Sequence, residues 1–99
     1  MILEIAEFSI DENRTQAFES DIEAGLTTVI TKAKGYIKHE LHHSKETPQR
    51  YVLHIYWQTL ENHTIDFRES DAFQTWRSII SPYFVRPPLV EHFDTIISS

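Results

Sequence analysis

Apolar residues follow two different spacings along the chain, and the change of spacing predicts the order of its elements. From Ile2 to Ile10 and from Tyr51 to Gln58, β-branched and aromatic residues are dense, which is typical of strands. Between these stretches, five apolar residues recur at helical spacing: Phe18, Ile22, Leu26, Val29 and Ala33. They form one stripe, so they predict a long amphipathic helix whose apolar side packs on the core.

Both ends of this helix carry recognisable signals. Asp11 is a predicted N-cap, and Glu12 follows it where a negative charge interacts favourably with the helix dipole. Gly35 comes shortly after Lys32 and directly after Lys34, which predicts a C-cap in left-handed geometry.

The rest of the chain predicts two further strands and a pair of short helices. Tyr36 to Ser44 carries many polar residues, which favours a strand at the edge of a sheet. From Leu60 the apolar spacing lengthens, and this predicts two short helices that break near Ser70. Prolines then mark an irregular connection before a last strand, predicted from Leu89 to Ile97.

The order strand, helix, strand, strand, helix pair, strand is typical of a ferredoxin-like fold. We therefore predict an α+β domain over residues 1–99, with an antiparallel sheet and its helices on one face. One set of alternating residues of the Tyr51 strand must then lie on the face away from the helices. Both sets are too apolar or aromatic to leave exposed, so we predict a homodimer whose sheets pack face to face. Such packing encloses a cavity between sheet and helices or between the two sheets.

Charge and composition exclude several classes of partner. The formal net charge is −6, which argues against nucleic acid and anionic membrane surfaces. The absence of cysteine excludes disulfides and thiolate metal sites. No apolar run approaches the roughly 20 residues of a membrane span. The N-terminus lacks the basic start and cleavage site of a signal peptide, so a cytoplasmic protein is expected.

Two of the six histidines are candidate bases. His54 lies in the middle of the most apolar strand, on the opposite side from Leu53 and Ile55. We predict that it faces the cavity and takes a proton from a phenolic substrate. The alternative is a hydrogen-bonded interface histidine paired with Glu40 or Asp94. His92 is the second candidate, although the facing of its strand is ambiguous.

The remaining candidate chemistry is weaker. His39 and His43 share one face of a polar strand, yet solvated edge residues explain them equally, and no metal site is predicted. Gly25 and Gly35 are the only glycines, so a glycine loop for flavin or nicotinamide is not expected.

Aromatic residues and one arginine are predicted to contact a substrate. Arg68 is suited to hold a substrate oxygen or an anion, and the alternative is pairing with Glu61 or Asp71 across a helix turn. The large aromatic residues either line a slot for an aromatic molecule or fill the core. The predicted substrate-binding residues are Tyr56, Trp57, Arg68, Trp76, Phe84 and Glu40.

Several short motifs resemble the antibiotic biosynthesis monooxygenase (ABM) family. They are Tyr56-Trp57-Gln58-Thr59-Leu60-Glu61, Phe67-Arg68-Glu69-Ser70, Phe73, Trp76-Arg77 and Pro88-Leu89-Val90-Glu91-His92-Phe93. The resemblance covers nearly the whole chain and implies a small dimeric α+β barrel with a pocket in each subunit. In some relatives this pocket oxidises quinols or polyketide-like phenols with molecular oxygen and no prosthetic group. The resemblance therefore implies a cofactor-independent monooxygenase acting on such a substrate; the alternative is a non-catalytic small-ligand-binding or stress-related module.

Other relatives bind and degrade haem. They use an asparagine on the first strand, a tryptophan after the third strand and a histidine on the following helix. Trp57 matches the tryptophan, but Ile2 to Ile10 contains no asparagine. His63 lies closer to Trp57 than that histidine does, and Asp66 and Phe67 occupy its usual place. Haem is therefore not expected, and molecular oxygen is the predicted co-substrate.

Overall fold

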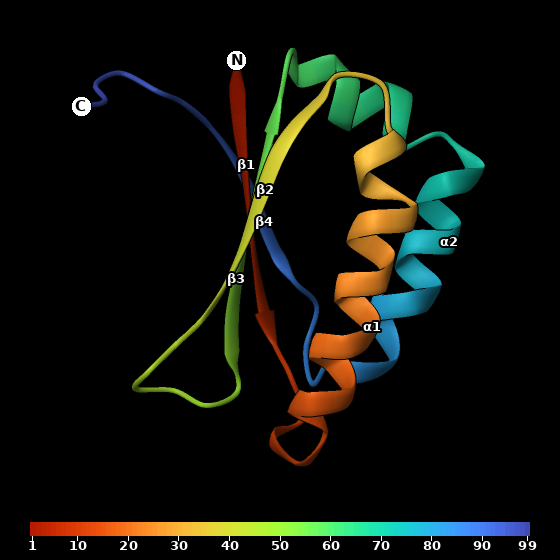
Figure 1. The fold of residues 1–99 in the computed structure, drawn as a ribbon, viewed down its shortest axis with the longest axis vertical. Coiled ribbons are helices and arrows are strands. Elements are labelled where there is room, and N and C mark those ends of the chain that lie inside the picture. Colours follow the sequence, from red (N-terminus) through yellow and green to blue (C-terminus); the bar gives the residue numbers. More distant parts are fainter.

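Four strands form one antiparallel sheet, and the helices pack on one of its faces (Figure 1). The structure is a computed structural model that describes residues 1–99. Its elements are β1 (Ile2–Ser9), η1 (Glu12–Arg14), α1 (Thr15–Thr28), η2 (Ile30–Lys32), β2 (Tyr36–His43), β3 (Arg50–Trp57), the π-helix η3 (Asn62–Phe67), α2 (Asp71–Ile80), η4 (Ser81–Tyr83) and β4 (Leu89–Asp94). The strand order is β2-β3-β1-β4, which leaves the polar β2 at an edge as predicted. The predicted α+β, ferredoxin-like fold is confirmed.

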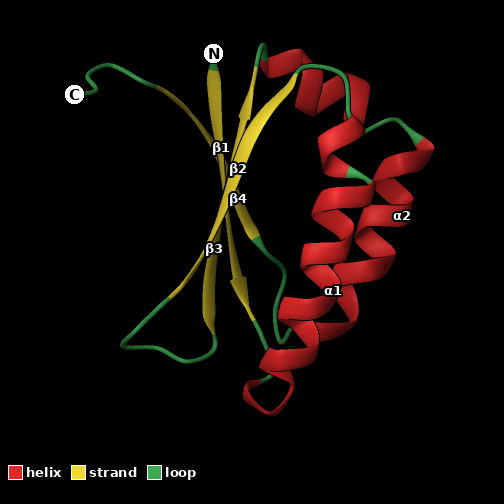
Figure 2. Cartoon of the chain, in the orientation of Figure 1, coloured by secondary structure: helices red, strands yellow, loops and turns green.

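The core lies between the sheet and the helical layer (Figure 2). Along β3, alternate residues are buried against the helices, and the residues between them are partly exposed on the other face. We call that other face the solvent face. The buried side of β3 comprises Tyr51, Leu53, Ile55 and Trp57. Phe18 and Ile22 of α1 and Ile80 of α2 complete the packing, so both helices use their apolar stripes as predicted.

The first helix is shorter than predicted. It ends at Thr28 because a run of β-branched residues follows, and the Thr27 and Thr28 hydroxyls bond back to helix carbonyls. Gly35 does have a positive φ of 84°, but it lies in a turn into β2 and not at a helix C-cap. Asp11 caps the short η1 turn by accepting a hydrogen bond from the Asn13 N–H.

The predicted helix pair is present, and its break lies at Ser70. Ser70 caps α2 by accepting a hydrogen bond from the Phe73 N–H. The first member of the pair is largely π-helical, which the apolar spacing did not indicate. None of the helices combines the length and apolar character required to span a bilayer.

The last strand is shorter than predicted. β4 ends at Asp94, where its pairing with β1 also ends. Ile96 and Ile97 lie beyond the sheet and are almost fully exposed, so nothing packs on them to extend the strand.

Candidate functional site

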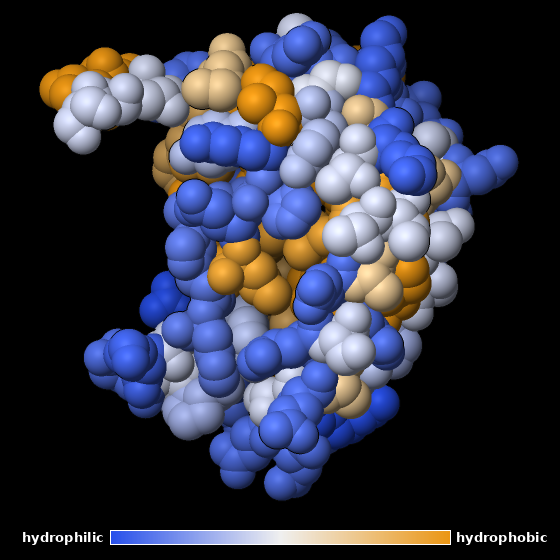
Figure 3. All heavy atoms as spheres, in the orientation of Figure 1, coloured by the Kyte–Doolittle hydropathy of each residue, from blue (hydrophilic) through white to orange (hydrophobic).

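A cavity of about 690 Å³ opens between the sheet and the helical layer. β1 and β3 form one wall, and η3, α2 and the segment after α2 form the other. Twelve of its 20 lining residues are hydrophobic, which leaves few polar groups to orient a ligand. Figure 3 shows apolar side chains at the bottom of a hollow rimmed by hydrophilic residues. Its size and apolar character are typical of sites for small organic molecules.

One carboxyl group faces this cavity from the sheet. Glu4 occupies the helix-facing side of β1 and is only 6% exposed. Its Oε1 accepts a hydrogen bond of 2.9 Å from Nε1 of the buried Trp57. Burial raises the pKa of Glu4 from 4.5 to about 7, although the Trp57 hydrogen bond and the positive charge of Arg68 oppose the shift. Glu4 can therefore gain or lose a proton near neutral pH, as a general acid or base must.

Two histidines continue from Glu4 toward the edge of the sheet. Nε2 of His63 lies 3.4 Å from Oε1 of Glu4, and Nδ1 of His63 lies 2.7 Å from Nε2 of His92. Burial lowers the pKa of His63 from 6.5 to about 3, with the charges of Arg68 and His92 adding to the effect. Burial also lowers the pKa of His92. Both rings are therefore neutral at pH 7, and one donates to the other. We call Glu4, His63 and His92 the relay.

Local structure fixes the position of the middle member of the relay. η3 begins with a reciprocal pair of hydrogen bonds, in which Thr59 N–H donates to Oδ1 of Asn62 and Asn62 N–H donates to Oγ1 of Thr59. The His63 ring then stacks on the Trp57 indole, with centroids 5.3 Å apart. π-helical turns recur at functional sites in proteins, and here one places an imidazole on the cavity wall.

Strand register brings the third member into contact. His92 on β4 lies directly opposite Glu4 on β1, so both side chains point toward the helices. This settles the facing of the last strand, which the sequence left ambiguous. His92 does not line the cavity. It contacts His63, which does.

Three of the predicted binding residues do line the cavity: Arg68, Trp76 and Phe84. Trp57 does not line it, because its fully buried indole lies behind Glu4 and His63. His54, Tyr56 and Glu40 lie on the solvent face, on the other side of the sheet.

The two candidate bases, His54 and His92, lie on opposite faces of the sheet. His54 lies opposite Ile5 of β1, whereas His92 lies opposite the adjacent Glu4. Successive residues of a strand point to opposite faces, so the two imidazoles are separated by the sheet. A catalytic role for His54 stays a prediction. His54 does not line the cavity between the sheet and the helices of this subunit.

Three arginines give the cavity a positive rim. Arg68, Arg77 and Arg86 all line it, and none of them forms an ion pair within the chain. Arg68 does not pair with Glu61 or Asp71; its guanidinium lies 5.8 Å from the centre of the Phe73 ring. In a chain of net charge −6, this concentration of unpaired cations at one opening favours an anionic group on the ligand.

Glu4 and His63 are candidate site residues of the cavity that the sequence analysis did not predict, since it weighed His63 only as a haem ligand. A signal for Glu4 was present, because it is the one charged residue on the side of β1 that also carries Ala6 and Phe8. A charged residue on an otherwise buried side is the informative exception to hydrophobic patterning. His63 gave no such signal, since its burial depends on the π-helical turn.

The relay leaves little room for haem ligation. Both ring nitrogens of His63 already face partners, Glu4 at 3.4 Å and His92 at 2.7 Å. An axial ligand needs one free imidazole nitrogen directed at the iron. The residues of this cavity therefore do not fit haem bound through His63.

Comparison with known proteins gives the family. The uncharacterized protein YczJ of Bacillus subtilis is 36% identical over 96 residues, which cover 97% of this chain and all of that protein. A Bordetella bronchiseptica protein, provisionally named an antibiotic biosynthesis monooxygenase, is also 36% identical, and its crystal structure matches with a TM-score of 0.91 over 97% of each chain.

A more distant match shows the fold alone. A variant of SnoaB, a cofactor-independent oxygenase from Streptomyces nogalater, matches with a TM-score of 0.81 at 12% identity, over 98% of this chain and 94% of that one. The sequence profile of the antibiotic biosynthesis monooxygenases matches residues 1–78. The chain belongs to the antibiotic biosynthesis monooxygenase family.

Proposed function

We propose that the protein is a cofactor-independent monooxygenase that oxidises a small aromatic or quinol-like molecule in the cavity. The observation that carries this proposal is Glu4, a buried carboxyl group with a pKa of about 7 on the wall of an apolar cavity. Such a group is matched to proton abstraction at neutral pH. Family membership supports the reaction class, and the fold is shared with an oxygenase that uses no cofactor.

The relay would act on the hydroxyl proton of the substrate. Glu4 takes this proton, and His63 and His92 can pass a proton on by exchanging donor and acceptor roles. Deprotonation raises the electron density of the ring, and the substrate anion then gives electrons to oxygen. Conversion of a ring CH₂, the keto form of a phenol, into C=O takes one oxygen atom and releases the other as water. The substrate carbon loses four electrons, which reduce both atoms of O₂, so the reaction balances without an external reductant.

The arginines would bind an acidic group of the substrate. Arg68, Arg77 and Arg86 have no carboxylate partner in the chain, and guanidinium groups suit carboxylates and enolates. Phe73, Trp76 and Phe84 offer apolar faces for an aromatic ring. We therefore place the substrate among aromatic acids and acidic polyphenols.

Oxygen uptake with a panel of dihydroxyaromatic compounds tests the proposal. We expect Glu4→Gln, which keeps the shape of the side chain and loses its basicity, to lower the rate by about 10²-fold or more. Glu7→Gln is the matched control, because Glu7 lies on the same strand but on the solvent face, paired with Arg50 at 2.8 Å. It should retain the wild-type rate.

Two results would overturn this function. Wild-type protein that consumes no oxygen with any member of the panel, yet binds some of them, indicates the non-catalytic binding module instead. Equal rates for Glu4→Gln and wild type would remove Glu4 from the mechanism. The haem alternative is excluded if the protein shows no haem-type absorption after incubation with haem and removal of unbound haem.

The homodimer belongs to the same proposal. The solvent face carries apolar residues on three strands, among them Ile5, Val52 and Phe93. Leu89 beside them is 68% exposed in the single chain. A second copy packed face to face would cover these residues and close a dimeric α+β barrel.

A further inference from the structure

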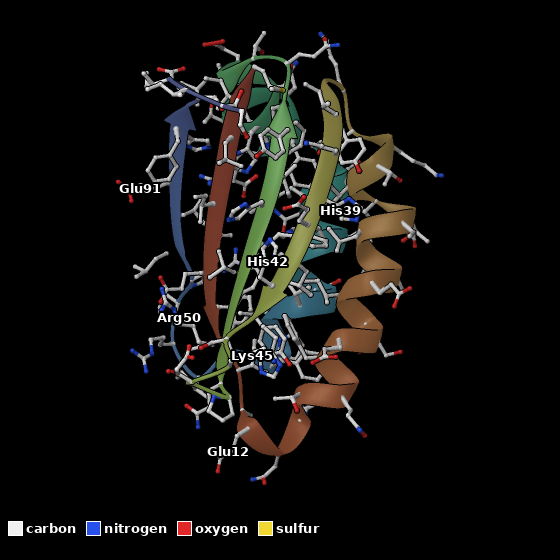
Figure 4. All side chains as sticks on the ribbon, turned by 60° about the vertical axis from the view of Figure 1, so that its left-hand side comes forward. Glu12, His39, His42, Lys45, Arg50 and Glu91 are labelled. Carbon is white, nitrogen blue, oxygen red and sulfur yellow. The ribbon has the colours of Figure 1, made fainter.

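A second group of functional side chains lies on the solvent face, away from the cavity. Glu40 and His42 are two residues apart on β2 and therefore share a face, and His54 lies directly opposite Glu40 on β3. One ligand atom from each residue lies within 4.8 Å of the other two. Figure 4 shows this side of the sheet, with His42 over the strands and His39 directed toward α1.

We propose that Glu40, His42 and His54 bind a first-row divalent cation, Zn²⁺ in the first instance. Two imidazoles and one carboxylate are a ligand set that zinc accepts, with a fourth position left for water or another donor. Tetrahedral zinc with bonds of about 2.0–2.1 Å needs ligand atoms about 3.4 Å apart. The ligand atoms lie within 4.8 Å of one another, so the proposal requires side-chain rotations that bring them closer by at most about 1.4 Å.

The hydrogen bonding of the six histidines independently supports the proposed Zn²⁺ site. His39, His43, His63 and His92 each make a hydrogen bond on the helix side of the sheet. His54 makes none, although it is half-buried, so both of its ring nitrogens are free. Its ring lies 5.1 Å from that of His42 with an edge-to-face tilt, and one nitrogen of each ring lies within 4.8 Å of the other.

The carboxylate is also available. The only ionic partner of Glu40 is His42 itself, at 3.2 Å. Lys38, two residues before Glu40 on the same strand, has its ammonium over the Tyr56 ring at 4.7 Å and forms no ion pair. A cation between Glu40 and the two imidazoles therefore displaces no competing charge.

Titration calorimetry with Zn²⁺ on chelator-treated protein tests the site, and Co²⁺ absorption reports on the ligands. We expect stoichiometric binding by wild type. His42→Ala, His54→Ala and Glu40→Gln should each weaken it by about 100-fold or more, since even outer-shell changes cost 10–100-fold. His39→Ala is the matched control: the residue lies on the same strand but on the opposite face, bonded to the Tyr36 hydroxyl, so zinc affinity should not change.

Three outcomes would overturn the site. One is the absence of a heat signal and of a Co²⁺ spectrum at millimolar metal. Another is unchanged affinity in the three ligand variants, which would place the metal elsewhere. Because the site lies on the face proposed for pairing of two copies, sedimentation of every variant is part of the test. Loss of zinc in a variant with the wild-type oligomeric state supports direct ligation; loss only in variants that no longer pair refutes it.

Discussion

Trp57 and Glu4 form a buried donor–acceptor pair across neighbouring strands, with Nε1 and Oε1 2.9 Å apart. The indole N–H can only donate, so it favours the ionised carboxylate. Burial favours the protonated acid and is the larger effect, which is why the pKa of Glu4 rises to about 7. The Trp57 hydrogen bond and the positive charge of Arg68 together oppose this rise and keep the carboxyl group titratable near neutral pH.

The first prediction concerns stability and pH. In the unfolded chain Glu4 ionises near pH 4.5, whereas in the folded protein it keeps its proton up to about pH 7. The folded state binds more protons in this window, so wild type loses stability as pH rises from about 4.5 to 7. The glutamine of Glu4→Gln cannot ionise, so this decrease in stability does not occur in the variant. We expect the difference in unfolding free energy to change in favour of the variant by about 3 kcal/mol across the window.

Urea unfolding at several pH values measures this difference. His63 acts in the opposite direction: its pKa is lowered to about 3, so its contribution is lost as pH falls from 6.5 toward 3. The causes of this shift are burial, Arg68 and His92, which both proteins share, so we expect most of the His63 contribution to cancel in the comparison. A difference that stays constant with pH would contradict a raised pKa for Glu4.

The second prediction concerns Gly35. Its φ of 84° disfavours any side chain, and a Cβ here would lie only 2.0 Å from Oδ1 of Asn62. That oxygen accepts the hydrogen bond from Thr59 that begins η3. Gly35→Ala should therefore destabilise the fold by about 2–4 kcal/mol, more than the backbone strain alone.

The neighbouring Lys34 supplies the control. It forms an exposed ion pair with Asp66 at 3.8 Å, and such pairs contribute little. Lys34→Ala should change the unfolding free energy by no more than about 0.5 kcal/mol. If Gly35→Ala lowered the unfolding free energy no more than Lys34→Ala does, the fold would not depend on the left-handed conformation at Gly35.

Much of the fold could be predicted from hydrophobic spacing, whereas the site could be predicted only in part: Arg68, Trp76 and Phe84 line the cavity as expected, but Glu4 and His63 were not predicted to. Strands such as Tyr51 to Gln58 are defined by their own composition, and the break near Ser70 was indicated by the change in apolar spacing. The end of α1 was missed because threonine hydroxyls compete for helix carbonyls, which spacing does not register. His54 was chosen as the candidate base because the sequence of a strand shows which residues share a face. It does not show which of the two faces the helices cover. His63 becomes a site residue only through the π-helical turn and its contact with His92.

The third prediction concerns pairing of two copies. Ile5 lies in the middle of the solvent face, between His54 and Glu91 on the neighbouring strands. A lysine there would place a charge in the proposed interface, which is costly to desolvate. We expect wild type to sediment as a dimer at micromolar concentration and Ile5→Lys as a monomer with an unchanged circular dichroism spectrum. Gln74→Lys, the same charge change on the exposed side of α2, should leave the dimer intact. A monomeric wild type would refute the face-to-face arrangement.

The fourth prediction concerns the arginines at the cavity. Arg77 is the best probe, because it lines the cavity but, unlike Arg68, does not influence the pKa values of the relay. Arg77→Gln should weaken binding of 2-naphthoate by about tenfold, which corresponds to one charge-assisted hydrogen bond. Binding of 2-naphthol, which has the same ring system and no charge at pH 7, should not change.

Calorimetry with the two compounds separates charge recognition from ring binding. Arg50→Gln removes a guanidinium that is paired with Glu7 on the solvent face, so it should alter neither affinity. Equal weakening of both compounds by Arg77→Gln would indicate a damaged cavity and not a lost anion contact. Equal affinity of wild type for both would mean that the three arginines do not select an acidic ligand. Because binding is measured without turnover, either result leaves the monooxygenase proposal to be decided by oxygen uptake.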